Sequence, residues 1–284
     1  MTPLDRFQEH RRTLVAIAYR MLGSSAEAED AVQDAWIRWQ STDHAAILNE
    51  LAWLSTALVR ICIDRLTSAQ ARRETYPGTW LPEPVLTTSP VDLESISLGF
   101  LVLLERLTPV ERAVFLLHQV FDYSHAEIGE ILGTNETASR QSLHRARQHV
   151  AAGRPRFDSS RETHEHLLHA FMGCLSRGDV ASFASVLAED ATLYGDGGGK
   201  VRGAIMRPLS GGDRVARFFT GLLAKTPTEP DLVVEVKDVN GWPALVGRTS
   251  AGISFVITIE TDGTHITTIR NVVNPEKLVL RHVD

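Results

Sequence analysis

The spacing of apolar residues changes along the chain, and this change constrains the fold more than any other sequence feature. Residues 5–73 and 93–150 repeat apolar side chains at the period of three to four that is typical of helices. Near the other end the period falls to two, in four stretches that indicate strands: Leu232–Val239, Ala244–Thr249, Ile253–Glu260 and His265–Val273. The sequence therefore predicts a multidomain protein, with all-α modules followed by a domain that contains a sheet.

Two breaks in the pattern divide the chain. Residues 76–92 contain four prolines, and a second break at 154–162 follows Gly153. We expect helical modules at 1–75 and 93–153, then a third domain at 163–284. In that domain three helices, at Thr163–Arg177, Asp179–Leu187 and Asp213–Ala224, are expected to pack on a curved antiparallel sheet of four strands, an α+β arrangement.

The second helical module contains strong helix-start signals. Thr108-Pro109-Val110-Glu111 combines an N-cap threonine, a proline at the first helical position and a glutamate at the third. Ser124-His125-Ala126-Glu127 is a second capping box, and a tight turn at Gly133-Thr134-Asn135 precedes a last helix at Glu136–Val150. Two short helices joined by a glycine-containing turn, the second of them basic, indicate a helix-turn-helix.

Charge argues against strong DNA binding by the chain alone. Residues 1–156 contain 16 Arg and no Lys against 19 Asp and Glu, a balance of −3, within a total of −6. Positive charge is local, because residues 134–156 hold five arginines against Glu136, or +4. Since phosphate contacts dominate non-specific affinity, such a chain should bind naked DNA weakly and depend on a partner for delivery.

Other signals are weak or absent. Cys62 and Cys174 match no metal spacing and fit a reducing cytoplasm. No run of eighteen apolar residues and no basic leader occurs, so we expect neither a membrane span nor a signal peptide. Gly197-Gly198-Gly199-Lys200 lacks the spacing of a nucleotide-binding loop, and we expect no cofactor and no catalytic residue.

Two helices contain polar rows that suit nucleic acid. Serine, threonine and arginine can reach bases and phosphates, and the outward positions of the last helix of the second module are Thr137, Ser139, Arg140, His144, Arg145 and Arg147. A solvated, arginine-rich helix end is the alternative. An aromatic and polar row that could hold unstacked bases lies in the helix expected at 48–69 and contains Trp53, Thr56, Arg60, Asp64 and Arg65. Residues 24–40 form an acidic face, which is either solvated or a docking surface.

Several motifs resemble those of the extracytoplasmic-function sigma factors. Two motifs resemble sigma region 2: Arg20-Met21-Leu22-Gly23 and Ala28-Glu29-Asp30-Ala31-Val32-Gln33-Asp34. Two others resemble sigma region 4: Tyr123-Ser124-His125-Ala126-Glu127-Ile128-Gly129 and Ser142-Leu143-His144-Arg145-Ala146-Arg147. The resemblance implies promoter DNA and core RNA polymerase, with its β′ and β subunits, as partners. It implies that Asp30, Gln33 and Asp34 bind polymerase, that the Trp53 row binds the −10 element, and that the last helix of the second module reads the −35 element.

The third domain resembles SnoaL-like, cone-shaped domains, which one subgroup of these sigma factors carries. Three motifs support this resemblance: Trp80-Leu81-Pro82-Glu83-Pro84, Asp196-Gly197-Gly198-Gly199-Lys200 and Asn274-Pro275-Glu276-Lys277-Leu278, the last with Glu276 where Asp is usual. Glycines allow close backbone approach, and prolines hold an extended strip that can dock. We therefore expect the linker to lie against residues 196–200, with residues 274–278 close by, and the domain to regulate activity.

Two other classes of function stay open at this point. One is a one-component helix-turn-helix regulator, controlled by a small molecule in the cone; the same domain of a sigma factor could also hold an unidentified small-molecule ligand. The other is an enzyme with a DNA-binding appendage, whose candidate residues at the mouth of the cone are His169, Asp190, Tyr194 and Asp196. The regulator leaves the acidic face at 24–40 unexplained, and the enzyme requires turnover by the third domain.

Overall fold

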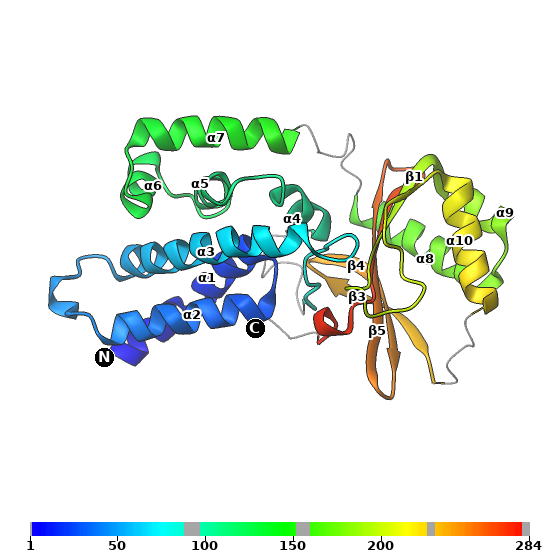
Figure 1. The fold of residues 1–284 in the computed structure, drawn as a ribbon, viewed down its shortest axis with the longest axis horizontal. Helices are drawn as coiled ribbons and strands as arrows, with labels where there is room; N and C mark the ends of the chain where they lie inside the picture. Colours follow the sequence, from blue (N-terminus) through cyan, green and yellow to red (C-terminus); the bar gives the residue numbers. More distant parts are fainter. Residues whose placement is uncertain (1, 88–96, 152–159, 226–230, 280–284) are drawn as a thin grey trace. The chain divides into compact units, whose positions relative to one another are not determined.

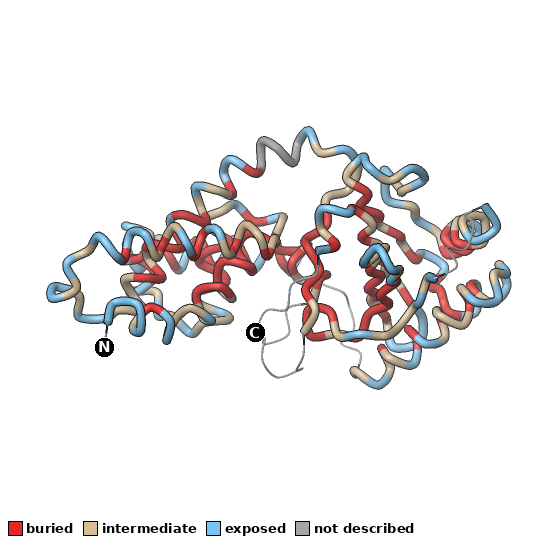
Figure 2. The backbone as a smooth tube through the Cα atoms, turned by 90° about the horizontal axis from the view of Figure 1, so that it is seen from below, coloured by how far each residue is buried: buried red, intermediate tan, exposed pale blue. Residues whose placement is uncertain are grey.

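The computed structural model describes residues 2–87, 97–151, 160–225 and 231–279, and the chain divides into two compact units. The first unit contains residues 1–75 and 100–154, and the second contains residues 76–99 and 155–283. Buried residues run along the helices of the first unit and along the sheet of the second (Figure 2). Each unit therefore has an apolar interior of its own.

The first unit is helical (Figure 1). Its elements are α1 (Pro3–Leu22), α2 (Ser25–Gln40), the 3-10 helix η1 (His44–Ala46), α3 (Glu50–Glu74), most of α4 (Leu98–Leu104), α5 (Pro109–Gln119), α6 (His125–Leu132) and α7 (Glu136–Ala151). Both predicted capping boxes of the second module form, with Thr108 and Ser124 as N-caps. Gly133 ends α6 in the left-handed conformation, so the predicted helix-turn-helix is confirmed. The expected helix start at Leu93 lies outside the described residues.

The two helical modules pack against each other within this unit. Arg112 on α5 is only 2% exposed, and its guanidinium donates to the carbonyl oxygens of Met21, at 2.8 Å, and Leu101, at 3.3 Å. The hydroxyls of Ser55 on α3 and Tyr123 before α6 lie 2.8 Å apart. Buried hydrogen bonds, as well as apolar contacts, therefore join residues 1–75 to residues 100–151.

The second unit is an α+β domain, as predicted. Its sheet has the strand order β2-β1-β6-β5-β4-β3, and its strands are β1 (Leu187–Asp196), β2 (Leu209–Ser210), β3 (Val233–Val239), β4 (Trp242–Thr249), β5 (Gly252–Thr261) and β6 (Ile266–Val272). Helices α8 (Arg161–Arg177), α9 (Val180–Ala184) and α10 (Gly212–Lys225) cover one face (Figure 1). Their core contains Phe171, Phe183 and Phe219, whose rings lie 5.3–5.7 Å apart. The 3-10 helix η2 (Pro275–Lys277) follows β6.

The sheet differs from the prediction in two respects. The described residues contain six strands rather than four, because 187–196 and 209–210 are also strands, and the helix expected at 179–187 ends at Ala184. The sheet is mixed rather than antiparallel, since β1 pairs with β6 in parallel. Glu189 and Asp190 interrupt the apolar alternation of β1, and its register shifts between Leu187 and Thr192, so this strand does not show the period-two pattern.

Candidate nucleic-acid interface and linker-docking site

One face of α7 presents polar side chains to solvent. Thr137, Arg140, His144 and Arg147 are exposed at helical spacing, whereas Leu143, Ala146 and Val150 are buried, as expected. Arg140 pairs with Glu136, and the Arg147 guanidinium donates to the Gln119 amide oxygen at 3.1 Å. Because these partners are themselves on the surface, DNA phosphates or bases could replace them at small cost.

Two other predicted residues of this helix contact neighbouring helices of the second module. Ser139 was expected to face outward, but it is 1% exposed and its hydroxyl lies 2.9 Å from Nδ1 of His125 on α6. The outward placement of Ser139 is therefore wrong. Arg145 is half-exposed and donates to the carboxylate of Glu111 at 3.1 Å, which ties α7 to the start of α5.

The predicted row on α3 is partly engaged by neighbouring helices. Trp53 packs on Trp39, with ring centroids 5.5 Å apart, and Thr56 donates to a carbonyl of its own helix. Nε of Arg60 donates to the carbonyl of Ile131 on α6 at 3.2 Å, while Asp64 is exposed. In this arrangement Arg60, one of the cations predicted to contact DNA, is therefore hydrogen-bonded to α6.

The acidic face of α2 is accessible at three positions. Asp30, Gln33 and Ile37 are exposed at a spacing that places them on the same side of the helix. Asp34, the third residue predicted to bind polymerase, instead accepts from the guanidinium of Arg65 on α3 at 2.6 Å. This ion pair joins a residue of the acidic face to a residue of the predicted −10 row.

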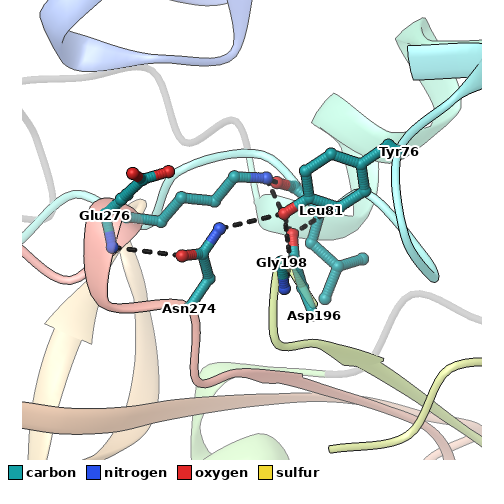
Figure 3. A network of polar contacts seen from close by, with 7 residues as sticks. Tyr76, Leu81, Asp196, Gly198, Asn274 and Glu276 are labelled. Carbon is teal, nitrogen blue, oxygen red and sulfur yellow. Dashed lines mark hydrogen bonds and ion pairs between the residues drawn. The ribbon is translucent and has the colours of Figure 1, made fainter. Parts of the chain in front are cut away.

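A buried carboxylate at the end of β1 holds the linker (Figure 3). Asp196 is completely buried, and it accepts hydrogen bonds from the hydroxyl of Tyr76 at 2.6 Å and from the backbone N–H of Leu81 at 2.8 Å. Nζ of Lys277 lies 2.7 Å from the same carboxylate, and the N–H of Gly198 donates to it at 3.1 Å. One side chain thus binds two points of the linker and Lys277, the last residue of η2.

Asn274 (Figure 3) and Lys277 complete this network. The side-chain amide of Asn274 donates to the Tyr76 hydroxyl at 2.9 Å, and Lys277 donates to the carbonyl of Leu81 at 2.6 Å. The ammonium also lies 4.2 Å from the centre of a ring of Trp80, a cation–π contact. Burial, together with the hydrogen bond to Asp196, raises the pKa of Tyr76 above its ordinary value, so Tyr76 stays a donor at neutral pH.

The glycines of residues 197–199 are required by this close approach. Gly198 and Gly199 have φ values of 60° and 71°, which favour glycine. A Cβ on Gly199 would lie 2.7 Å from Cγ of Pro77, and one on Gly198 would lie 2.5 Å from the amide nitrogen of Asn274. The predicted docking of the linker against residues 196–200, with residues 274–278 close by, is therefore confirmed.

The three motifs contribute unequally. Lys200 pairs with Glu276 at the surface, and the cation that reaches the linker is Lys277. Gly197, Leu278 and the two prolines of the linker motif, Pro82 and Pro84, are buried, whereas Pro275 is exposed. Tyr76 is a functional candidate that was not predicted; its only sequence signal is an aromatic residue at the first position of the linker.

The far part of the linker extends the sheet edge. The carbonyl of Val85 accepts from the N–H of Asn240 at 2.8 Å, and the N–H of Val85 donates to the Asn240 side chain at 3.2 Å. Leu86 forms an isolated antiparallel bridge with Val239 at the end of β3. Residues 76–87 are therefore held at both ends.

Within the described ranges, no three His, Cys, Asp or Glu side chains are arranged to hold a metal ion. None of the described helices combines the length and apolar character needed to cross a lipid bilayer. Both cysteines are buried and unpaired, and burial raises the pKa of the Cys62 thiol to about 12. The two cysteines are therefore part of the apolar cores.

Comparisons with known proteins agree with this arrangement. Residues 6–72 match the model of Sigma-70 region 2, and residues 98–150 match that of Sigma-70, region 4. The chain is 41% identical over 231 residues to the ECF RNA polymerase sigma factor SigJ of Mycobacterium tuberculosis, covering 78% of this chain and 73% of that protein. It is 29% identical over 280 residues to a probable ECF RNA polymerase sigma factor, SigI, of the same organism, covering 96% and 93%.

A solved structure covers both units. The crystal structure of the Mycobacterium tuberculosis extracytoplasmic function sigma factor SigJ matches with a TM-score of 0.73 at 32% identity, covering 96% of this chain and 97% of that one. Two sigma regions in the correct order, and a relative similar over most of its length, establish the assignment. The chain belongs to the extracytoplasmic-function family of RNA polymerase sigma factors, which bind core polymerase and promoter DNA to initiate transcription.

Proposed function

We propose that α7 reads the −35 element, that α3 binds the −10 element, and that the exposed face of α2 docks on core polymerase. The residues assigned to the −35 element are Thr137, Arg140, His144 and Arg147, with Arg145 as a positioning residue. Those assigned to the −10 element are Trp53, Thr56, Arg60, Asp64 and Arg65, and Asp30, Gln33 and Asp34 are assigned to polymerase. The exposed polar face of α7 carries the proposal, because it follows a capped helix and a tight turn.

We further propose that the C-terminal domain regulates initiation through the docked linker. Residues 76–87 are about half of the segment between α3, which ends at Glu74, and α4, which begins at Leu98. A free chain spans at most about 3.3–3.6 Å per residue, so holding these residues shortens the reach between the two DNA-binding regions. Docking and release of the linker would thus change which promoter spacings the two regions can bridge.

The first expected result is that specific initiation requires core polymerase. The +4 segment at 134–156 is too small a basic surface for tight independent binding, and the chain as a whole carries −6. Run-off transcription with and without core enzyme, next to a binding titration of the free protein, measures this dependence. Nanomolar, sequence-specific binding by the free protein at physiological salt would favour a one-component regulator instead.

Arg140→Ala and Arg147→Ala should each weaken −35 recognition. A lost base-specific arginine costs about 1–3 kcal/mol and relaxes preference at one position, whereas a lost phosphate contact weakens binding to every sequence. Initiation from a library of −35 variants separates these outcomes. Ser139→Ala is the matched control, because Ser139 is buried and should not change base preference. Unchanged rates and preferences in both arginine variants would show that another face of α7 meets DNA.

A further inference from the structure

An apolar cavity of about 270 Å³ lies between α8, α10 and the sheet of the second unit. Both helices and three strands line it, and it is partly open to solvent. Its principal walls are Leu175, Phe219, Leu222, Leu223, Phe255 and Ile257. The cavity is distinct from the linker-docking site, and the residues earlier considered for the mouth of the cone (169, 190, 194 and 196) do not line it.

The lining chemistry restricts what could enter. No lining side chain is charged, so a charged group would lose its hydration without compensation. Two lining residues are polar, and the hydroxyl of Ser176 is already used, because it donates to the carbonyl of Met172 at 3.2 Å. Asn271 is the other. Its side-chain Oδ1 is buried and has no hydrogen-bond partner among the residues that the structure describes.

Asn271 is unusual for its position on β6. Ile269, two residues before it on the same face, belongs to the core, and Val273, two residues after it, lines the cavity. The residue opposite Asn271 on the neighbouring strand β5 is Ile257, which also lines the cavity. An unpaired amide oxygen in an apolar row costs free energy, whereas an aliphatic residue there would not, so the fold alone does not explain this asparagine.

We propose that this cavity binds a small, neutral, largely apolar molecule that has one hydroxyl or N–H group, and that this group donates a hydrogen bond to Oδ1 of Asn271. The cavity has the size of a bicyclic compound rather than of a peptide or a nucleotide. The polar donor pairs the buried oxygen, and the rest of the molecule takes apolar surface out of water.

A molecule bound in this cavity would lie close to the linker-docking site. Val273 lines the cavity, and its N–H donates to the backbone carbonyl of Asp196 at 2.9 Å. The next residue, Asn274, binds Tyr76. Ligand binding itself does not depend on the regulatory role proposed for the linker, and the two can fail separately, because binding is measured without transcription.

The test uses the full-length chain and three probes of similar shape: indole, indene and indole-5-carboxylate. Titration calorimetry or ligand-observed NMR should show saturable binding of indole, about five- to tenfold tighter than indene, which lacks the N–H. The carboxylate should not bind. Equal affinities for indole and indene would overturn the role of Asn271, and no binding of indole at millimolar concentration would overturn the site.

Two variants locate the binding. Asn271→Leu should abolish the preference for indole over indene while both still bind. Leu223→Trp should abolish binding of both, because Leu223 lines the cavity and is 40% exposed, so a larger side chain can fill the opening. Arg217→Trp, at an exposed position of the same helix, is the matched control and should bind like the parent. Unchanged indole binding in Leu223→Trp would place the probe elsewhere.

Discussion

Replacing Asp196 with alanine should lower the free energy of unfolding of the second unit by about 3–5 kcal/mol and release the linker. The variant leaves Lys277, whose side chain is 12% exposed, without its carboxylate. The Tyr76 hydroxyl and the Leu81 N–H lose their acceptor as well. Hydrogen exchange resolved over β1 and β6 measures the stability, proteolysis of residues 76–87 measures release, and initiation at matched protein levels measures the consequence.

Two comparisons make this prediction specific. Lys200→Ala removes an ion pair between exposed side chains, so its expected effect is about 0–1 kcal/mol with the linker still docked. Trp80→Ala keeps the buried ion pair but removes the ring over Lys277, and it should loosen the linker with a smaller loss of stability. A several-fold change in initiation rate should follow linker release in Asp196→Ala and Trp80→Ala, whereas Lys200→Ala should initiate at the parental rate. Parental rates from a chain whose linker is released would exclude the regulatory role of docking.

Arg112→Met should destabilise the first unit by about 3 kcal/mol. The guanidinium is buried on α5, and its loss removes its hydrogen bonds to the carbonyls of Met21 and Leu101 and its ion pair with Glu105. Because Met21 belongs to α1, hydrogen exchange should accelerate at the end of α1 as well as in α5. Arg106→Met is the matched control, since Arg106 is exposed. Similar exchange in both variants would mean that Arg112 does not couple the two modules.

Local signals predicted the helical modules accurately. An N-cap threonine or serine, with a glutamate three residues on, satisfies its own hydrogen bonds within one turn, so Thr108 and Ser124 act as expected whatever surrounds them. The direction in which a helical side chain points depends less on local sequence, because it is set by the helices that pack around it. Ser139 belongs to the buried side of α7 because α6 packs there, and helical spacing alone did not separate it from Thr137.

Distant pairing explains why β1 was not predicted. It pairs in parallel with β6, roughly 75 residues further along the chain, and its exposed residues Glu189 and Asp190 fall within the register shift between Leu187 and Thr192. The docking of the linker could be predicted because its prolines and glycines fit neither a helix nor a strand. The lysine that reaches the linker could not be predicted, because the sequence offers both Lys200 and Lys277, and only the position of η2 places Lys277 over Trp80.

The span of the linker contacts has a consequence for synthesis on the ribosome. Tyr76 and Asn274, which share a hydrogen bond, are 198 residues apart. Domains fold as units from the N-terminal side at about 5–20 residues per second during translation, so helices α1 to α7 are complete before the residues that hold the linker exist. About 123 residues separate the end of α7 from Asn274, so every nascent chain passes through an interval of roughly 6–25 s in which both DNA-binding regions are formed and the segment between them is unrestrained.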